Sequence, residues 1–127
     1  MIFFIGDLVI KPVRRNKWQL MQSFHARLDE TNFIDVPKGF VCDLASIPRL
    51  LTPLFPVHGL HTRAAVVHDW LYANEGDVDG GPFTREQADQ IFLLGMESLG
   101  VGYFTRMAMY WAVGFAGGLA WGGQDER

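Results

Sequence analysis

The chain has 127 residues, enough for one domain with a sizeable hydrophobic core and too few for a second. Its 11 Lys and Arg residues are outnumbered by 14 Asp and Glu residues, and the formal net charge of -3 argues against binding to duplex nucleic acid through the phosphates. Cys42 is the one cysteine, which excludes an internal disulfide and a cysteine-rich zinc site and is typical of a reducing compartment.

Residues 1–42 predict β-strands, because short apolar or alternating stretches recur between turn-forming residues. The apolar or alternating stretches are 2–5, 8–10, 18–24 and 33–36. Turns are expected at 14–17 and 29–32, which are polar and contain asparagine. Together these features predict a small antiparallel sheet. The first apolar run is too short, and lacks the basic residues, for a signal peptide.

Residues 43–60 predict a mostly irregular crossing, because Pro48, Pro53 and Pro56 interrupt any regular element. Within it, the apolar segment 50–57 is expected either to pack into the core or to line a pocket or a partner interface. The chain then changes to the period of α-helices over residues 61–122.

Thr62 is expected to cap a first helix over 63–73, which an acidic loop follows. Thr84 and Gln87 have the spacing of a capping box, so a second helix begins there and ends near Gly100. A third helix is expected over 103–120. A sheet followed by about three helices predicts a single α+β domain that spans residues 1–127.

The last helix is strongly apolar, since residues 107–123 include Tyr110, Trp111 and Trp121 and no charged side chain. This composition favours burial, or self-association or contact with another protein through residues 103–122. A membrane span is the less favoured alternative, because a span needs about 20 apolar residues and five glycines dilute this stretch.

His68 and Asp69 are the most informative residues, because they interrupt an otherwise apolar helical pattern between Ala64 and Leu71. A buried carboxylate is costly unless it meets a cation, a hydrogen-bond donor or a metal ion. Asp43 and Asp89 also stand where the pattern favours apolar or neutral residues. His68, Asp43, Asp69 and Asp89 therefore form a candidate ligand set for one divalent metal ion.

A structural explanation accounts for the same residues without catalysis. Arg106 is a cation next to the apolar run of the last helix, and it or Arg85 would pair with Asp69 or Asp89. His68 would then bond to Tyr72 or to a carbonyl group. Residue types alone favour this internal network over the metal site.

Nucleophilic catalysis is a weaker hypothesis. Ser46 could combine with His68 and an aspartate, but no Gly-x-Ser-x-Gly elbow or oxyanion-hole loop accompanies it. Cys42 could act as a thiolate with His68 as its base. A lone cysteine beside an apolar strand is more often a small core residue.

Three segments and Arg106 carry a resemblance to a known family. The segments are Val36–Arg49, Ala64–Tyr72 and Arg85–Phe92. In this order they resemble the domain-of-unknown-function family 1353 over nearly the whole chain. The positions that match the family pattern are Gly39, Phe40, Asp43, Ser46, Pro48, His68, Asp69, Tyr72, Arg85, Ala88, Asp89 and Arg106.

The resemblance implies a tailed-bacteriophage or prophage setting and leaves the function open. It implies that Asp43, Ser46, Asp89 and Arg106 form a polar cluster with His68 and Asp69. The family has threonine where this chain has Cys42, which argues against a cysteine nucleophile.

Two functions are therefore expected. The first is a virion protein made in the host cytoplasm, a tail-associated structural or interaction protein that contacts other virion or tail proteins. The alternative is a metal-dependent hydrolase with His68 and Asp69 as catalytic residues, for which peptidoglycan would be a natural phage substrate.

Overall fold

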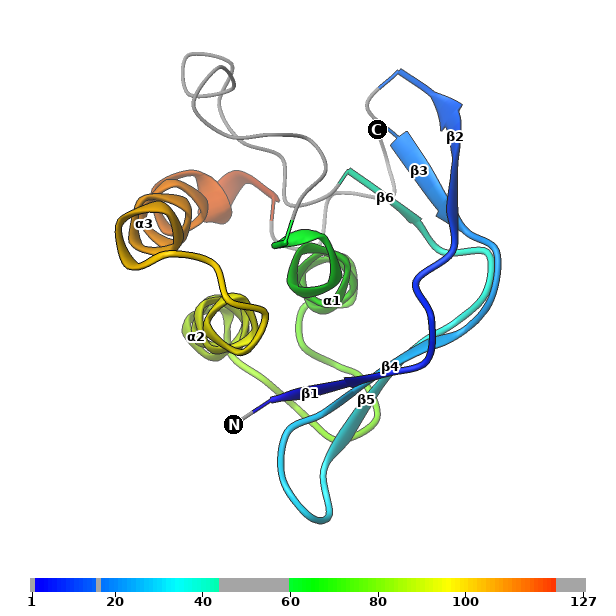
Figure 1. The fold of residues 1–127 in the computed structure, drawn as a ribbon, viewed down its shortest axis with the longest axis horizontal. Helices are drawn as coiled ribbons and strands as arrows, with labels where there is room; N and C mark the ends of the chain where they lie inside the picture. Colours follow the sequence, from blue (N-terminus) through cyan, green and yellow to red (C-terminus); the bar gives the residue numbers. More distant parts are fainter. Residues whose placement is uncertain (1, 16, 44–59, 121–127) are drawn as a thin grey trace.

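The computed structural model describes residues 2–15, 17–43 and 60–120 of the chain. In this part strands come first and helices after, which confirms the predicted α+β class (Figure 1). The strands are β1 (Phe3–Ile5), β2 (Ile10–Arg14), β3 (Lys17–Leu20), β4 (Phe24–Arg27), β5 (Phe33–Val36) and β6 (Val41–Cys42). The helices are α1 (Thr62–Ala73), α2 (Arg85–Ser98) and α3 (Tyr103–Ala120).

The described strands form two three-stranded antiparallel sheets, in the orders β1-β4-β5 and β2-β3-β6, where one small sheet was predicted. The stretch 18–24 is not one strand, because the chain bends at Met21 and Gln22 and passes from the second sheet to the first. The alternation survives this bend because Leu20 and Phe24 are both buried, an even number of residues apart. Side chains of a strand alternate with a period of two residues, so an interruption of even length leaves the alternation in phase. The sequence pattern therefore does not reveal where one strand ends and the next begins.

The inner face of the first sheet is apolar and covers α1. Ala26 of β4 lies opposite Phe4 of β1 and Ile34 of β5, and Phe4 stacks on Phe24 at 5.8 Å between ring centroids. The predicted turn at 29–32 joins β4 to β5. There the Asp29 carboxylate accepts the backbone N–H groups of Thr31 and Asn32, which lowers the pKa of Asp29.

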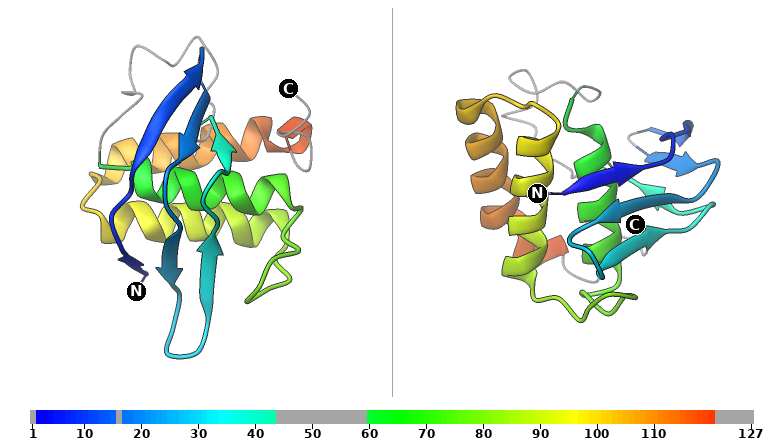
Figure 2. Two further views of the ribbon diagram at one scale, coloured as in Figure 1. Left: turned by 90° about the vertical axis from the view of Figure 1, so that its right-hand side faces the viewer. Right: turned by 60° about the horizontal axis from the view of Figure 1, so that its bottom comes forward.

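The three helices lie side by side, and the strands cross them on one side (Figure 2). In Figure 1, α1 lies beside the strands, and α2 packs against both α1 and α3. Because α1 is enclosed on several sides, Ala64–Asp69, Leu71 and Tyr72 are all buried. A central helix of this kind needs apolar residues nearly all round.

The helix ends test the capping predictions. The capping box of α2 is confirmed, since Thr84 accepts the Gln87 backbone N–H at 3.1 Å and the Gln87 side chain accepts the Thr84 N–H at 2.9 Å. The predicted cap of α1 is wrong by one residue. His61 holds the cap position without a side-chain cap bond, and Thr62 is already helical.

The third helix has the predicted bounds. No helix within the described ranges is long and apolar enough to cross a membrane. Residues 44–59 and 121–122, for which an irregular crossing and a helical end were predicted, lie outside the described residues.

Candidate functional site

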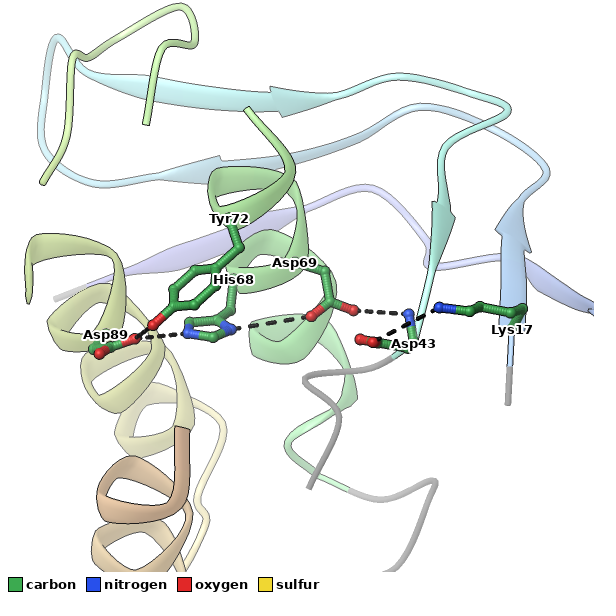
Figure 3. A network of polar contacts seen from close by, with 6 residues as sticks. All are labelled: Lys17, Asp43, His68, Asp69, Tyr72 and Asp89. Carbon is green, nitrogen blue, oxygen red and sulfur yellow. Dashed lines mark hydrogen bonds and ion pairs between the residues drawn. The ribbon is translucent and has the colours of Figure 1, made fainter. Parts of the chain in front are cut away.

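His68 and Asp69 point from α1 in two directions. Successive residues of an α-helix are about 100° apart around its axis, so one helix presents these neighbours to different elements. His68 faces α2 and Asp69 faces β6, and both are buried, with 2% and 0% of the residue exposed (Figure 3). The pair therefore links α1 to the helices on one side and to the strands on the other.

On the α2 side, Asp89 accepts two hydrogen bonds through the same carboxylate oxygen. The His68 Nε2–H group donates to Asp89 Oδ1 at 2.8 Å, and the Tyr72 hydroxyl donates to Oδ1 at 2.6 Å. Tyr72 follows His68 by one helical turn, which places both donors on the same face of α1. Their rings are also in contact, with centroids 4.2 Å apart.

On the strand side, Asp69 accepts a hydrogen bond through its second oxygen. The backbone N–H of Asp43, at the end of β6, donates to Asp69 Oδ2 at 3.0 Å. The carboxylate of Asp43 in turn lies 3.9 Å from Lys17 Nζ at the start of β3. The polar network thus consists of Tyr72, Asp89, His68, Asp69, Asp43 and Lys17 (Figure 3).

The two halves of the network meet at His68. Its Nδ1 atom lies 4.0 Å from Asp69 Oδ1, which is an ion-pair distance and too long for a hydrogen bond. Within the described residues Nδ1 is buried and has no hydrogen-bond partner. His68 Nδ1 is therefore the atom of the polar network whose hydrogen-bonding capacity is not used within the described residues.

Burial in this network changes the chemistry of Tyr72. Desolvation of the phenol, and its hydrogen bond to the nearby Asp89 carboxylate, raise the pKa of Tyr72 far above its usual value, and the charge of Arg85 lowers it in part. Tyr72 therefore remains a neutral donor at physiological pH. It can hold Asp89 in place but cannot serve as a base.

The candidate metal ligands His68, Asp43, Asp69 and Asp89 are arranged in a line. Over the described part of the chain no group of three or more His, Cys, Asp or Glu side chains is placed to hold a metal ion. His68 Nε2 and Asp89 Oδ1 are hydrogen-bonded to each other, and Asp69 Oδ2 accepts a hydrogen bond from the backbone N–H of Asp43. The described atoms do not fit a shared metal ion.

Arg106 lies apart from the polar network, which corrects its predicted place in the cluster. Its guanidinium donates to the Val101 carbonyl at 3.0 Å, lies 3.6 Å from Glu97 and covers the Tyr103 ring. Glu97 is about two helical turns from Asp89 along α2. Arg85 instead approaches the Gly114 carbonyl of α3, at 3.5 Å.

Ser46 and Lys17 are the remaining residues at which the sequence prediction and the described site differ in content. Ser46 lies outside the described residues. Lys17 was not recognised as part of the site, because its approach to Asp43 depends on strand register. Trp18 lies opposite Cys42 across β3 and β6, and this register brings their neighbours Lys17 and Asp43 together. Nothing in the local pattern around Lys17 indicates that contact.

The family model described as "Protein of unknown function (DUF1353)" matches residues 18–113, more than half of the chain. The chain belongs to the DUF1353 family. The match runs from β3 into α3 and includes Asp43, His68, Asp69, Tyr72 and Asp89. No curated protein and no solved structure matches this DUF1353 chain.

The network of this DUF1353 protein joins two of its helices to the strands. Asp89 is on α2, His68 and Asp69 are on α1, and Asp43 directly follows β6. The Asp69, His68 and Asp89 side chains are at most 8% exposed, so water competes little for these bonds. Their arrangement is suited to fixing how α1 packs between α2 and the strands.

Proposed function

We propose that this chain is a bacteriophage or prophage protein that acts in or on the virion as a tail-associated structural or interaction protein. The viral setting comes from the resemblance to tailed-phage and prophage proteins. The mode of action is argued from the surface of α3, and the polar network then serves to hold the fold that presents this surface.

The observation that carries the proposal is a row of exposed aromatic side chains on α3. Phe104, Trp111 and Phe115 are 86%, 71% and 95% exposed. We call these three residues the aromatic stripe. Soluble domains rarely leave several large aromatic side chains together in water, and aromatic residues are enriched where proteins bind other proteins.

The opposite face of α3 supports the same reading. Met109, Ala112 and Val113 are buried, and α3 packs on α2 through this side. Within the described residues, α3 is anchored through this buried side. The aromatic stripe lies outside that contact, and a binding role explains its composition.

The proposal is tested on purified particles of a phage that encodes this chain. We expect its peptides in the particles by mass spectrometry, enriched in separated tails. The variant Phe115→Glu should lose this incorporation while the free protein still folds, because the side chain is almost fully exposed. Phe3→Glu is the matched control, since Phe3 is a half-exposed aromatic residue on the sheet side. Absence of the wild-type chain from particles would refute a virion role.

The metal-dependent hydrolase is the second candidate, and one observation favours it. His68 Nδ1 is buried, lacks a hydrogen-bond partner within the described residues and faces Asp69 Oδ1 at 4.0 Å. A ligand or a water molecule bound to Nδ1 would give this atom a hydrogen-bond partner. In that case His68 and Asp69 would be the catalytic residues, and peptidoglycan would be the first substrate to assay.

A further inference from the structure

The spacing of exposed residues on α3 is that of a two-helix seam. Phe104, Ala108, Trp111 and Phe115 are all exposed and follow one another at intervals of four, three and four. At about 100° per residue these positions fall within a sector of about 60°. Intervals of four and three are those of the a and d positions of a coiled coil, which face a partner helix.

The same four residues are also symmetric about the middle of the helix. If a second copy of α3 is laid antiparallel across a two-fold axis at residues 109 and 110, Phe104 faces Phe115 of the other copy. Ala108 then faces Trp111 of the other copy. A small side chain thus meets the largest one, and the pattern is self-complementary, as a two-fold interface requires.

In the part of α3 that the structure describes, no charge opposes this pairing. The stripe and Ala108 are uncharged, and the nearest cation on α3, Arg106, is turned to Glu97 and the Val101 carbonyl. Antiparallel helices also place their dipoles in opposite directions, which is electrostatically favourable. A parallel pairing would set the dipoles side by side and Trp111 against Trp111.

The area is sufficient for a specific dimer. On dimerisation, the three aromatic side chains of the stripe would bury roughly 500 Å² of accessible surface per copy, or roughly 1,000 Å² for the two copies together. A specific interface needs about 1,000 Å² or somewhat more in total. The exposed Tyr103, at the start of α3, contacts the Phe104 ring, with the ring centroids 5.4 Å apart.

We infer that the partner of the aromatic stripe is a second copy of this chain, bound antiparallel through α3. This inference rests on the proposed interaction function and names its partner. Phe104, Trp111 and Phe115 form the core of the interface, and Ala108 provides the space that Trp111 of the other copy fills.

Sedimentation of the purified full chain tests the inference. The wild-type protein should have twice the mass of the 14.3 kDa chain. Phe104→Lys and Phe115→Glu should each weaken the dimer by roughly 30-fold, as for a central interface residue. The double variant should recover dimerisation, because each introduced lysine then faces a glutamate of the other copy. Phe3→Glu should remain dimeric, and circular dichroism should show that every variant is folded.

Three outcomes would overturn the dimer. One is a wild-type chain that stays monomeric at high micromolar concentration. The second is a dimer that the double variant fails to restore. The third is a monomer that binds vesicles of phosphatidylcholine and phosphatidylglycerol through the stripe, which would make lipid the partner.

The dimer and the virion role fail separately. A monomer that still enters particles, and loses entry with Phe115→Glu, overturns the dimer alone. A dimer that is absent from particles supports the dimer and overturns the virion role.

Discussion

His68 Nε2 donates to Asp89 Oδ1 at 2.8 Å across the contact between α1 and α2, although the two residues are 21 positions apart. A second histidine–aspartate pair, His25 and Asp35, lies on the outer face of the first sheet at 2.5 Å. The two pairs have the same chemistry and differ in burial. Asp89 is 8% exposed and Asp35 is 55% exposed. This difference allows a matched test of what the polar network contributes.

We expect His68→Ala to lower the free energy of unfolding by about 3 kcal/mol, because it leaves a buried carboxylate without one of its donors. His25→Ala should cost less than about 1 kcal/mol, since water can solvate Asp35. Urea unfolding would measure the loss of stability in both variants. The slope of the free energy of unfolding against urea concentration should be unchanged in both. Equal losses in the two variants would contradict a structural role for the buried pair.

Tyr72 should make stability fall at alkaline pH. Its pKa is raised in the folded protein above the ordinary value of 10.0. Above about pH 10 the unfolded chain therefore releases the phenol proton while the folded chain keeps it. The free energy of unfolding then falls by up to roughly 1.4 kcal/mol per pH unit from this group, and its contribution is fully present below pH 10.

The variant Tyr72→Phe isolates this effect. It should lower stability at neutral pH by about 1 to 2 kcal/mol, because Asp89 loses a buried hydroxyl donor. It should also make the decline above pH 10 shallower than in the wild type. Tyr103→Phe is the control, since this phenol is 58% exposed. An identical alkaline slope in wild type and Tyr72→Phe would show that the phenol is not held in this way.

Gly76 should not tolerate alanine. Its φ is +75°, and a Cβ atom there would lie 1.8 Å from the backbone oxygen of Phe83, so the loop between α1 and α2 would have to move. We expect Gly76→Ala to cost about 3 kcal/mol or more. Gly100 has a similar φ of +86° and open space around it, so Gly100→Ala should cost only about 1 to 2 kcal/mol of strain. Thermal melting would compare the two.

The metal-dependent alternative has a direct test. If the polar network is structural, elemental analysis should find no stoichiometric zinc, manganese or magnesium in the purified protein. The melting temperature should also be unchanged by a chelator. Stoichiometric metal that is lost in His68→Ala would instead favour the hydrolase and justify cell-wall digestion assays.

The sequence determined the class of fold, because the signals for it are local. Alternation in the first 42 residues and the capping box at Thr84 each depend on neighbouring residues, and both predicted the right type of element. The anomaly of His68 and Asp69 was equally visible, since a polar pair in an apolar helix can be recognised within one turn. The sequence also indicated that both side chains would need partners.

Only the tertiary structure decided which partners these are. Arg106 was a reasonable partner by charge, yet it lies by Glu97, and Asp89 is bonded by His68 and Tyr72. Lys17 lies close to Asp43 because of the register in which β3 pairs with β6. The residue pattern of a single strand does not specify that register. Contacts between residues far apart in sequence depend on how the helices and strands pack. Charge alone does not identify them, because several alternative pairs of an acidic and a basic residue would be equally complementary. The order of the elements was therefore encoded locally, and the geometry of the polar network arose from packing.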